Sequence, residues 1–440
     1  MGRSNYNDEE EVPLGINRIW VYKQDEEHVD SGQGLDEDQV SEYDDEPETT
    51  SSSSSKSYSD EELKRLARRN RVYRPSRFRK WKLGLLGLAG FIGLSIGTTT
   101  LVMHLKQSAT TSTTKLNEKP TLNFRKVGKS YKFKVVQLAD LHFGEDAGTE
   151  EGRRKDEATW RVVDSILKAE QPDLIVLSGD QISAETIEDN ANGYYYMIGE
   201  HLSHYGIPWA LTFGAHDDAD YHKSGSDTTT KAKYSREDLL AVDMSFPLSM
   251  TQRGPHEIFG MTNYMLEMNI DGFGPAANIY MFDSGGGQLP SMLKQNQVEW
   301  FYNSPQRLPA IAFQHHPTGQ LRYDPQKCKG FHEESVELLE YDPGITEAMS
   351  ESGRVHFLAV GQAHGNDYCC HFSPWMQVCF GAHSGYGGYG DWERGARVYE
   401  LSIEDPSTYE MDWDSWVRLE SGDVQDIVTQ EMMLRMPDGI

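Results

Sequence analysis

The chain has 440 residues, enough for one large domain or for two ordinary ones with appended segments. Its 69 acidic and 42 basic side chains give a formal net charge of −27, which argues against nucleic acid as a partner. Much of the acidic excess lies near the N-terminus, so the charge says little about any folded part.

Residues 1–60 are crowded with Asp and Glu and contain a run of Ser. So few apolar side chains cannot offset the chain entropy that folding removes. We therefore expect a disordered acidic tail in this segment.

A basic segment, 61–82, runs directly into residues 83–105, which contain no Asp, Glu, Lys or Arg. About 20 apolar residues cross a bilayer core of about 30 Å, so a transmembrane helix is predicted here, with a buried core helix as the alternative. Lys and Arg stay on the cytosolic side. The acidic tail, with partners that the sequence does not identify, should then be cytosolic. The rest should be lumenal or extracellular, which makes this a single-pass signal anchor.

All four cysteines follow the expected membrane span, which fits an oxidising compartment. A bond between the adjacent Cys369 and Cys370 is sterically poor. One of them should therefore pair with Cys379 and the other with Cys328, and the sequence leaves open which pairs with which.

Apolar runs alternate with helix-period segments from residue 131 onward, after a polar stalk over 106–130. The order strand, helix, strand, helix, strand implies a largely parallel sheet with right-handed crossovers. These elements are predicted over 131–140, 157–170, 172–180, 192–205 and 207–217. Further strands are predicted over 263–270, 278–285, 309–317, 355–367, 376–383 and 396–404. We expect one α/β domain over 131–404 and a polar C-terminal tail over 405–440.

Several predicted strands end in Asp or His directly after an apolar run. Ligands of open α/β sheets bind beyond the carboxyl ends of the strands, so these side chains should converge on one crevice. A single such residue is more often a solvated loop residue or a cap, but a series in chain order is hard to assign to chance. The residues are Asp140, His142, Asp180, His216, Asp217, His315, His316 and His364.

Asp140 and His142 stand two residues apart, so at an extended strand end both would point to one side and bind one ion. Carboxylates mixed with imidazoles suit Fe, Mn or Zn, whereas the cysteines lie elsewhere and offer no thiolate site. Such ions activate water near neutral pH, and pairs of them about 3.5–4 Å apart stabilise both oxygens of a displacement at phosphorus.

The motifs DLH, SGDQ, GAHD, AFQHHP and GQAH together resemble, in order and spacing, the calcineurin-like metallophosphoesterases. Phrases such as VDMSFPLSMTQRGP and GAHSGYGGYGDWERGARVYEL are similar to the purple-acid-phosphatase-like branch of that superfamily. The resemblance covers roughly residues 131–404. It implies an α/β/β/α sandwich of two mixed sheets and hydrolysis of a phosphate-ester substrate.

The resemblance also implies a set of metal ligands. The first ion would be held by Asp140, His142, Asp180 and His364, with Asp180 bridging to a second ion. That second ion would take His315, but the family's Asn is replaced by Ala215 and one family His by Gln362. Ala offers no donor atom, and the amide oxygen of Gln362 is a weaker ligand than imidazole. One tight site and a weak second site are expected.

Catalytic and substrate-binding roles follow from the same resemblance. His216 would stabilise charge on the phosphoryl group or protonate the leaving group, oriented by the neighbouring Asp217. The Gly-rich segment 381–397 would cradle phosphate through backbone N–H groups, with Arg394 or Arg397 adding charge. The alternative is a turn-rich loop, tied by a disulfide, that merely lies near the site.

Two functions remain compatible with these residues. The first is a membrane-anchored phosphoesterase with reduced activity, which the retained His216 and His364 favour. The second is a catalytically impaired, membrane-anchored binding or scaffolding protein, which the two departures at the second ion favour.

Overall fold

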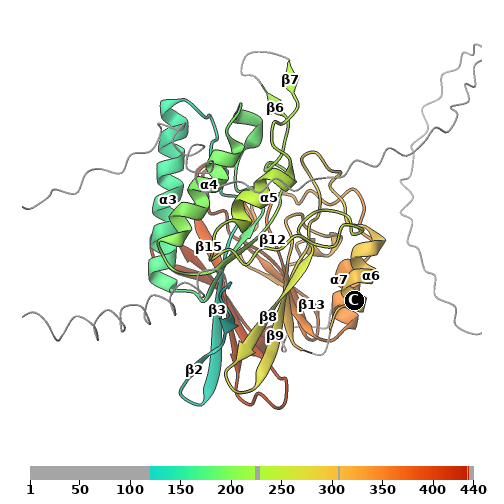
Figure 1. The fold of residues 1–440 in the computed structure, drawn as a ribbon. Helices are drawn as coiled ribbons and strands as arrows, with labels where there is room; N and C mark the ends of the chain where they lie inside the picture. Colours follow the sequence, from blue (N-terminus) through green and yellow to red (C-terminus); the bar gives the residue numbers. More distant parts are fainter. Residues whose placement is uncertain (1–118, 223–227, 306–307, 434, 436–440) are drawn as a thin grey trace, which may run out of the picture. The chain divides into compact units, whose positions relative to one another are not determined.

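A computed structural model describes residues 119–222, 228–305, 308–433 and 435 (Figure 1). All of them belong to the compact unit Ser55–Ile440. The expected acidic tail, the basic segment and the membrane helix over 83–105 lie outside the described residues. Within the described part of the chain, no helix combines the length and apolar character that a bilayer crossing requires.

The first sheet has the strand order β17-β16-β15-β3-β4-β5, with β2 pairing to β3. The three strands β3, β4 and β5 are parallel, as the sequence predicts, and the remaining pairs are antiparallel. The strands are β2 (Arg125–Val127), β3 (Ser130–Leu138), β4 (Leu174–Ser178), β5 (Trp209–Thr212), β15 (Gly395–Ile403), β16 (Asp412–Leu419) and β17 (Val424–Thr429).

The second sheet has the order β1-β8-β9-β10-β12-β14-β13-β11 and is also mixed. Its central strands β9, β10, β12 and β14 run parallel. The pairs β8–β9, β13–β14 and β11–β13 are antiparallel, and the edge pair β1–β8 is parallel. The strands are β1 (Leu122–Asn123), β8 (Tyr264–Ile270), β9 (Gly274–Met281), β10 (Ala310–Phe313), β11 (Cys328–Lys329), β12 (Val355–Val360), β13 (Cys369–Ser373) and β14 (Met376–Phe380).

Helices cover the outer face of each sheet (Figure 1). The helices α3 (Glu150–Glu170), α4 (Ala191–Ser203) and α5 (Arg236–Met244) cover the first sheet, and α6 (Gln295–Asn303) and α7 (Ile345–Glu351) cover the second. A third core of side chains from both sheets lies between them. Short elements complete the domain: η1 (Ala184–Thr186), η2 (Gly319–Leu321), β6 (Tyr221–His222), β7 (Thr229–Thr230) and α8 (Gln430–Met433).

The mixed α/β fold with two mixed sheets is therefore confirmed, whereas a largely parallel sheet describes only the centre of each. The expected boundaries are too narrow. Strands β1 and β2 precede residue 131, and β16 and β17 lie in the expected C-terminal tail. In β16, every second residue is buried, from Trp413 to Leu419, and the residues between them are exposed or half-buried. Such a strand is half-buried, so its composition looks polar although it is part of the sheet.

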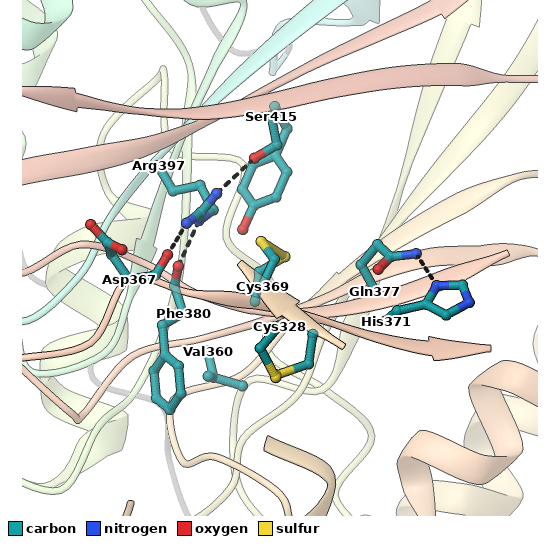
Figure 2. Close-up of a disulfide and its surroundings, with 12 residues drawn as sticks. Cys328, Val360, Asp367, Cys369, His371, Gln377, Phe380, Arg397 and Ser415 are labelled. Atoms are coloured by element: carbon teal, nitrogen blue, oxygen red, sulfur yellow. Dashed lines mark hydrogen bonds between the residues drawn. A yellow bond between two sulfur atoms is a disulfide. The ribbon is translucent and has the colours of Figure 1, made fainter. Parts of the chain in front are cut away.

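Two disulfides tie the end of the second sheet, Cys328–Cys370 and Cys369–Cys379 (Figure 2). The antiparallel register places each cysteine of β13 directly opposite its partner, on β11 and on β14. The prediction that the adjacent pair would divide between Cys328 and Cys379 is confirmed.

Candidate metal centre

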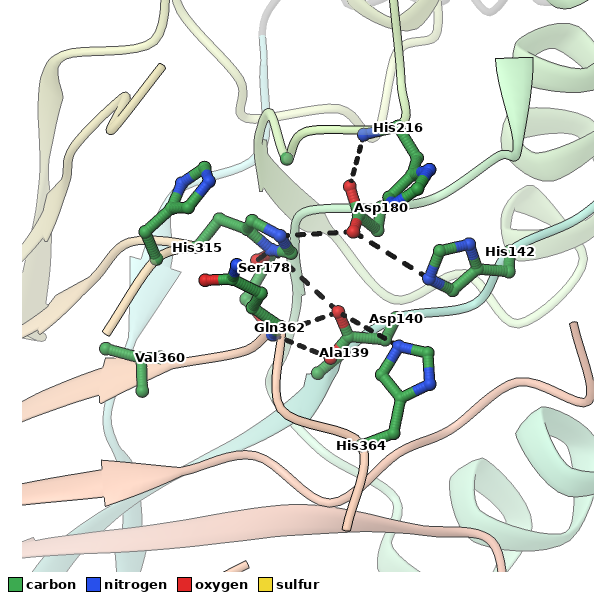
Figure 3. A network of polar contacts seen from close by, with 12 residues as sticks. Ala139, Asp140, His142, Ser178, Asp180, His216, His315, Val360, Gln362 and His364 are labelled. Atoms are coloured by element: carbon green, nitrogen blue, oxygen red, sulfur yellow. Dashed lines mark hydrogen bonds and ion pairs between the residues drawn. The ribbon is translucent and has the colours of Figure 1, made fainter. Parts of the chain in front are cut away.

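Carboxylates and imidazoles from four separate strand ends meet in one place (Figure 3). Ligand atoms of Asp140, His142 and His364 lie within 4.8 Å of one another, and so do those of Asp140, Asp180 and His315. All five side chains are buried. The structure therefore brings together the five Asp and His residues that were expected to hold metal.

The backbone at these residues is in the left-handed region rather than extended. Asp140 has φ 57°, His142 46°, Asp180 53° and Gln362 72°. Non-glycine residues adopt this region rarely and at some cost, and such strain gathers at functional sites. The expectation of an extended strand end at Asp140 and His142 is therefore wrong. Instead, the two loops interlock, because the His142 N–H donates to the Asp180 carbonyl at 2.9 Å.

The imidazoles of the site have their ring protons fixed by neighbours. His364 Nδ1 lies 3.1 Å from the Tyr389 carbonyl, and His315 Nδ1 lies 3.1 Å from the Ser178 carbonyl. A carbonyl only accepts, so in both rings Nδ1 carries a proton, and Nε2 is the nitrogen that faces the carboxylates. His142 Nδ1 contacts Ser183 Oγ at 2.9 Å.

Two buried polar atoms of the site, His142 Nε2 and Gln362 Oε1, have no hydrogen-bond partner within the described residues, and His315 Nε2 has only the Asp180 carboxylate beside it. A buried polar atom without a partner is costly, so it calls for an explanation. Nitrogen lone pairs beside two carboxylates are the donor set that a transition metal ion prefers. The residues present therefore fit an ion.

At His315 burial would lower the pKa, but the carboxylates of Asp180 and Asp140 outweigh it and raise the pKa to about 9. Burial keeps the other two imidazoles, His142 and His364, neutral. It lowers the pKa of His142 well below its usual value and that of His364 to about 4. Burial also raises the pKa of Asp140 to about 7, with the nearby Asp180 carboxylate adding to the effect and His315 opposing it. Burial alone would raise the pKa of Asp180 too, but the imidazoles of His315 and His216 outweigh it and lower that pKa. Neutral imidazoles have the lone pairs that metal binding needs.

The set of ligands for the second expected ion is less complete. His315 Nε2 is 3.1 Å from Asp180 Oδ2, and the Gln362 backbone N–H donates to both oxygens of Asp140, at 3.0 and 3.1 Å. Ala215 packs beside Gly286, where an added Cβ would lie 2.9 Å from the Ala215 Cβ. The position contributes packing and no ligand atom.

His216 is the accessible member of the cluster, because 44% of its side chain is exposed. Its Nδ1 contacts Glu185 Oε1 at 2.5 Å, and its backbone N–H donates to Asp180 Oδ1 at 2.7 Å. Burial would lower the pKa of His216, but the carboxylates of Asp180 and Glu185 outweigh it and raise the pKa to about 10.

The residue that orients His216 is Glu185 and not Asp217, which corrects the expectation from the sequence. The Asp217 carboxylate accepts backbone N–H groups from Gln181 at 2.9 Å, Gly214 at 2.8 Å and Asp180 at 3.1 Å. Both oxygens of Asp217 thus accept hydrogen bonds from the backbone, and these bonds fix the loop that carries Asp180. Asp217 is a structural brace.

The Gly-rich segment packs onto the ligands rather than forming an open cradle. A Cβ on Gly387 would lie 2.7 Å from the Cβ of His142, and one on Gly388 would lie 2.4 Å from Cε1 of His364. Gly388 also has φ 72°, which favours glycine. The glycines let this loop approach the two imidazoles closely enough to hold them in place.

Neither arginine offers its guanidinium to a substrate, so the structure corrects that expectation. Arg394 donates to the carbonyls of Gly385, Gly390 and Trp392, within its own loop. Arg397 is fully buried and donates to the Phe380 and Asp367 carbonyls and to Ser415 (Figure 2). Both arginines stabilise the fold.

Two residues of the site, Glu185 and His383, are not among those that the sequence predicts. The ring of His383 is buried and lies 3.8 Å from the ring of His364, centroid to centroid. His383 follows β14, so the rule that strand ends carry the site could have found it. Glu185 lies in the short helix η1, five positions after Asp180, where no periodicity or strand end marks it.

Comparison with known proteins agrees with this geometry. The family described as Calcineurin-like phosphoesterase matches residues 133–346. The chain is 28% identical to "Probable inactive purple acid phosphatase 28" of Arabidopsis thaliana over 373 residues, which cover 73% of this chain and 88% of that relative. It is 27% identical to "Probable inactive purple acid phosphatase 29" of the same plant, covering 62% and 77%. "Phosphatase DCR2" of Saccharomyces cerevisiae is 27% identical, covering 69% of this chain and 56% of that relative.

The family match includes four of the five buried Asp and His residues, and His364 follows it along the chain. The fold, the order of the motifs and the named relatives agree with one another. Residues 133–346 therefore form a calcineurin-like phosphoesterase domain, and the chain is similar to the branch of proteins named purple acid phosphatases.

Proposed function

We propose that this protein is a metal-dependent phosphoesterase that hydrolyses a phosphate ester at one tightly held metal ion. The observation that carries the proposal is the convergence of Asp140, His142, Asp180 and His364, with His315 beside them, in a buried cluster. Fe, Mn and Zn are the ions that suit this mixture of oxygen and nitrogen donors. When bound, such an ion polarises a phosphoryl oxygen and activates water near neutral pH.

The chain's own residues supply the remaining chemistry. Glu185 accepts the Nδ1 proton of His216, so the ring is oriented and its Nε2 is left to face the substrate. With a proton on Nε2, His216 donates to a phosphoryl oxygen or to the departing oxygen of the ester. Its partial exposure, in contrast to the buried ligands, allows a substrate to reach it.

The second ion is expected to bind weakly. Asp180, His315 and the amide oxygen of Gln362 remain as ligands, but Ala215 removes one donor outright. Loss of a ligand reduces the stabilisation of transition-state charge, so activity below that of a complete two-ion site is proposed.

A catalytically impaired binding protein is the second candidate function. The observation that favours it is Ala215, and two plant relatives carry the words "probable inactive" in their names. The yeast relative, by contrast, is named a phosphatase. In this second function the metal centre would bind a phosphorylated partner without turning it over.

For location, we propose a single-pass membrane protein with a cytosolic N-terminus and a lumenal or extracellular phosphoesterase domain. The apolar segment 83–105, its basic flank and the disulfide-paired cysteines support this arrangement. Deleting residues 83–105 should move the protein from the membrane fraction to the soluble fraction, and unchanged fractionation would remove the anchor from the proposal.

The test of activity uses the full-length chain, freed of metal and then supplied with Mn, Fe or Zn. Hydrolysis of 4-nitrophenyl phosphate is measured for the parent and for His216→Ala. Metal-dependent turnover that falls by about 100-fold in the variant supports the phosphoesterase. A parent that binds metal but is inert with all three ions supports the impaired binding protein.

A further inference from the structure

Three aromatic rings form a stack that leads from the interior to the surface at the metal centre. The ring centroids of His383 and His364 are 3.8 Å apart, and those of His364 and Tyr389 are 4.0 Å apart with an interplanar angle of 11°. His383 is 2% exposed and His364 5%, but Tyr389 is 51% exposed. The outermost ring of the stack therefore presents a large surface to solvent directly beside a proposed metal ligand.

Tyr389 is held in place although it is exposed. Its ring lies flat on His364, its carbonyl accepts the Nδ1 proton of that histidine at 3.1 Å, and its hydroxyl donates to Glu334 Oε1 at 3.1 Å. The stacking of one face of the ring on His364 and the hydrogen bond of the hydroxyl group fix the direction of the ring. A binding surface fixed in advance loses little conformational entropy when a ligand contacts it.

The hydroxyl group of Tyr389 shows where the exposed ring lies relative to the metal centre. It is 3.5 Å from the carbonyl of Gln362, whose backbone N–H binds the Asp140 carboxylate. The ring thus lies along the loop that carries two residues of the site, Gln362 and His364. A group esterified to a phosphate in the centre would leave past this loop or past His216, which lies on the other side of His142 from His364 in Figure 3.

We infer that Tyr389 determines substrate specificity by stacking its exposed ring against a flat aromatic group of the phosphate ester. Aryl groups and nucleobases share this chemistry, because each has a π face. The inference rests on the proposed function, since binding of the phosphate at the metal centre is what brings the aromatic group to Tyr389.

The test measures equilibrium binding, so it does not depend on turnover. The full-length chain is loaded with Mn²⁺ and titrated with two matched pairs of ligands. Phenylphosphonate against methylphosphonate tests a ring close to phosphorus, and adenosine 5′-monophosphate against ribose 5-phosphate tests a base carried on a sugar. Stacking predicts that the aromatic member of at least one pair binds about tenfold more tightly.

Two variants separate the ring from the hydroxyl group. Tyr389→Phe and Tyr389→Leu both lose the hydrogen bond to Glu334, but only Phe keeps an aromatic ring. The preference should survive in Tyr389→Phe and disappear in Tyr389→Leu, with equal Mn²⁺ content in both, which shows that His364 still binds.

Each outcome has one meaning. A parent that binds all four ligands without preferring the aromatic ones, or a preference that survives in Tyr389→Leu, overturns the inference and leaves the phosphoesterase intact. A ring-dependent preference in a chain that shows no turnover supports the inference and counts against catalysis. Binding of none of the four ligands by the Mn²⁺-loaded parent contradicts both.

Discussion

Glu185 and His216 form a hydrogen-bonded pair, with Oε1 and Nδ1 2.5 Å apart, although 31 positions separate them along the chain. The pair links the short helix η1, which follows the loop of Asp180, to the loop after β5. The orienting acid and the proposed proton donor thus come from two loops that also share Asp180, since its carboxylate accepts the His216 N–H. A disturbance of one partner should reach the reaction through the other.

Glu185→Gln should lower kcat/KM by about tenfold or more, because the amide keeps the shape of Glu185 but stabilises a charged imidazole less well. The measurement is a double-mutant cycle on 4-nitrophenyl phosphate. In the His216→Ala background the Glu185→Gln change should have almost no effect, because the residue acts through His216. Two effects that simply add would show that Glu185 acts on its own.

Gly388→Ala should weaken metal affinity by about 10–100-fold, as is typical when the support of a ligand is lost. The added methyl group would lie 2.4 Å from Cε1 of His364 and 3.1 Å from Cδ2 of His142, so both rings must move. Gly206→Ala is the matched control, because Gly206 also has a positive φ but has open space at its Cβ position. Competition with a chromogenic chelator measures both variants, and equal affinity in the two would contradict the bracing role of the loop.

Asp156→Asn should stabilise the fold above pH 7 by roughly 2–5 °C in Tm. Burial raises the pKa of Asp156 to about 7, although the N–H of Gly144 donates to it at 2.9 Å. A folded pKa above the unfolded value means that Asp156 contributes stability at low pH, which is lost as pH rises from about 4 to about 7. The uncharged amide avoids this loss.

Thermal unfolding at pH 5 and pH 8 checks this sign. The advantage of Asp156→Asn should be largest at pH 8 and should shrink at pH 5, where the parent carboxyl is mostly protonated. The exposed Asp412→Asn removes one negative charge elsewhere and serves as the control. An equal gain at both pH values would mean that the desolvated charge is not the cause.

Restoring both missing ligands should convert the weak second site into a tight one. Ala215→Asn with Gln362→His is expected to raise metal content toward two ions per chain and to increase the rate on 4-nitrophenyl phosphate. Ala215 packs against Gly286, so each single variant is also measured to separate crowding from ligation. A double variant that stays folded but gains neither metal nor rate would show that the second site has lost more than two ligands.

The sequence predicts the metal centre well for a physical reason. Asp140 and Asp180 follow neighbouring parallel strands of the first sheet, and His315 and His364 follow neighbouring parallel strands of the second. Parallel strands bring their carboxyl ends to one edge of their sheet, so each pair is expected to lie together. The motif order then assigns them to one family. The same reasoning fails for Asp217, because a neighbour in sequence need not face the same way in space. Its carboxylate turns back onto the Asp180 loop.

The positive charge of Arg394 and Arg397 is also not enough to predict substrate binding. A sequence shows that a guanidinium is present but not that backbone carbonyls already occupy its donors. The sequence does not predict Glu185 and Tyr389 as site residues, because only the folded loops bring Glu185 beside His216 and Tyr389 beside His364. The sequence does not predict β16, because exposed and half-buried residues alternate with its buried ones, or the edge strand β17, in which Val428 is the one buried residue.

The most direct test of the central claim is the metal content of the purified full-length chain, measured by elemental analysis beside Asp180→Asn and His256→Ala. Asp180 lies within the buried cluster, whereas His256 is exposed and belongs to neither group of ligand atoms. The account predicts about one transition metal ion per chain in the parent and in His256→Ala, and a clear loss in Asp180→Asn. A folded parent that retains no metal when Mn, Fe and Zn are supplied, or equal metal in all three proteins, would contradict it.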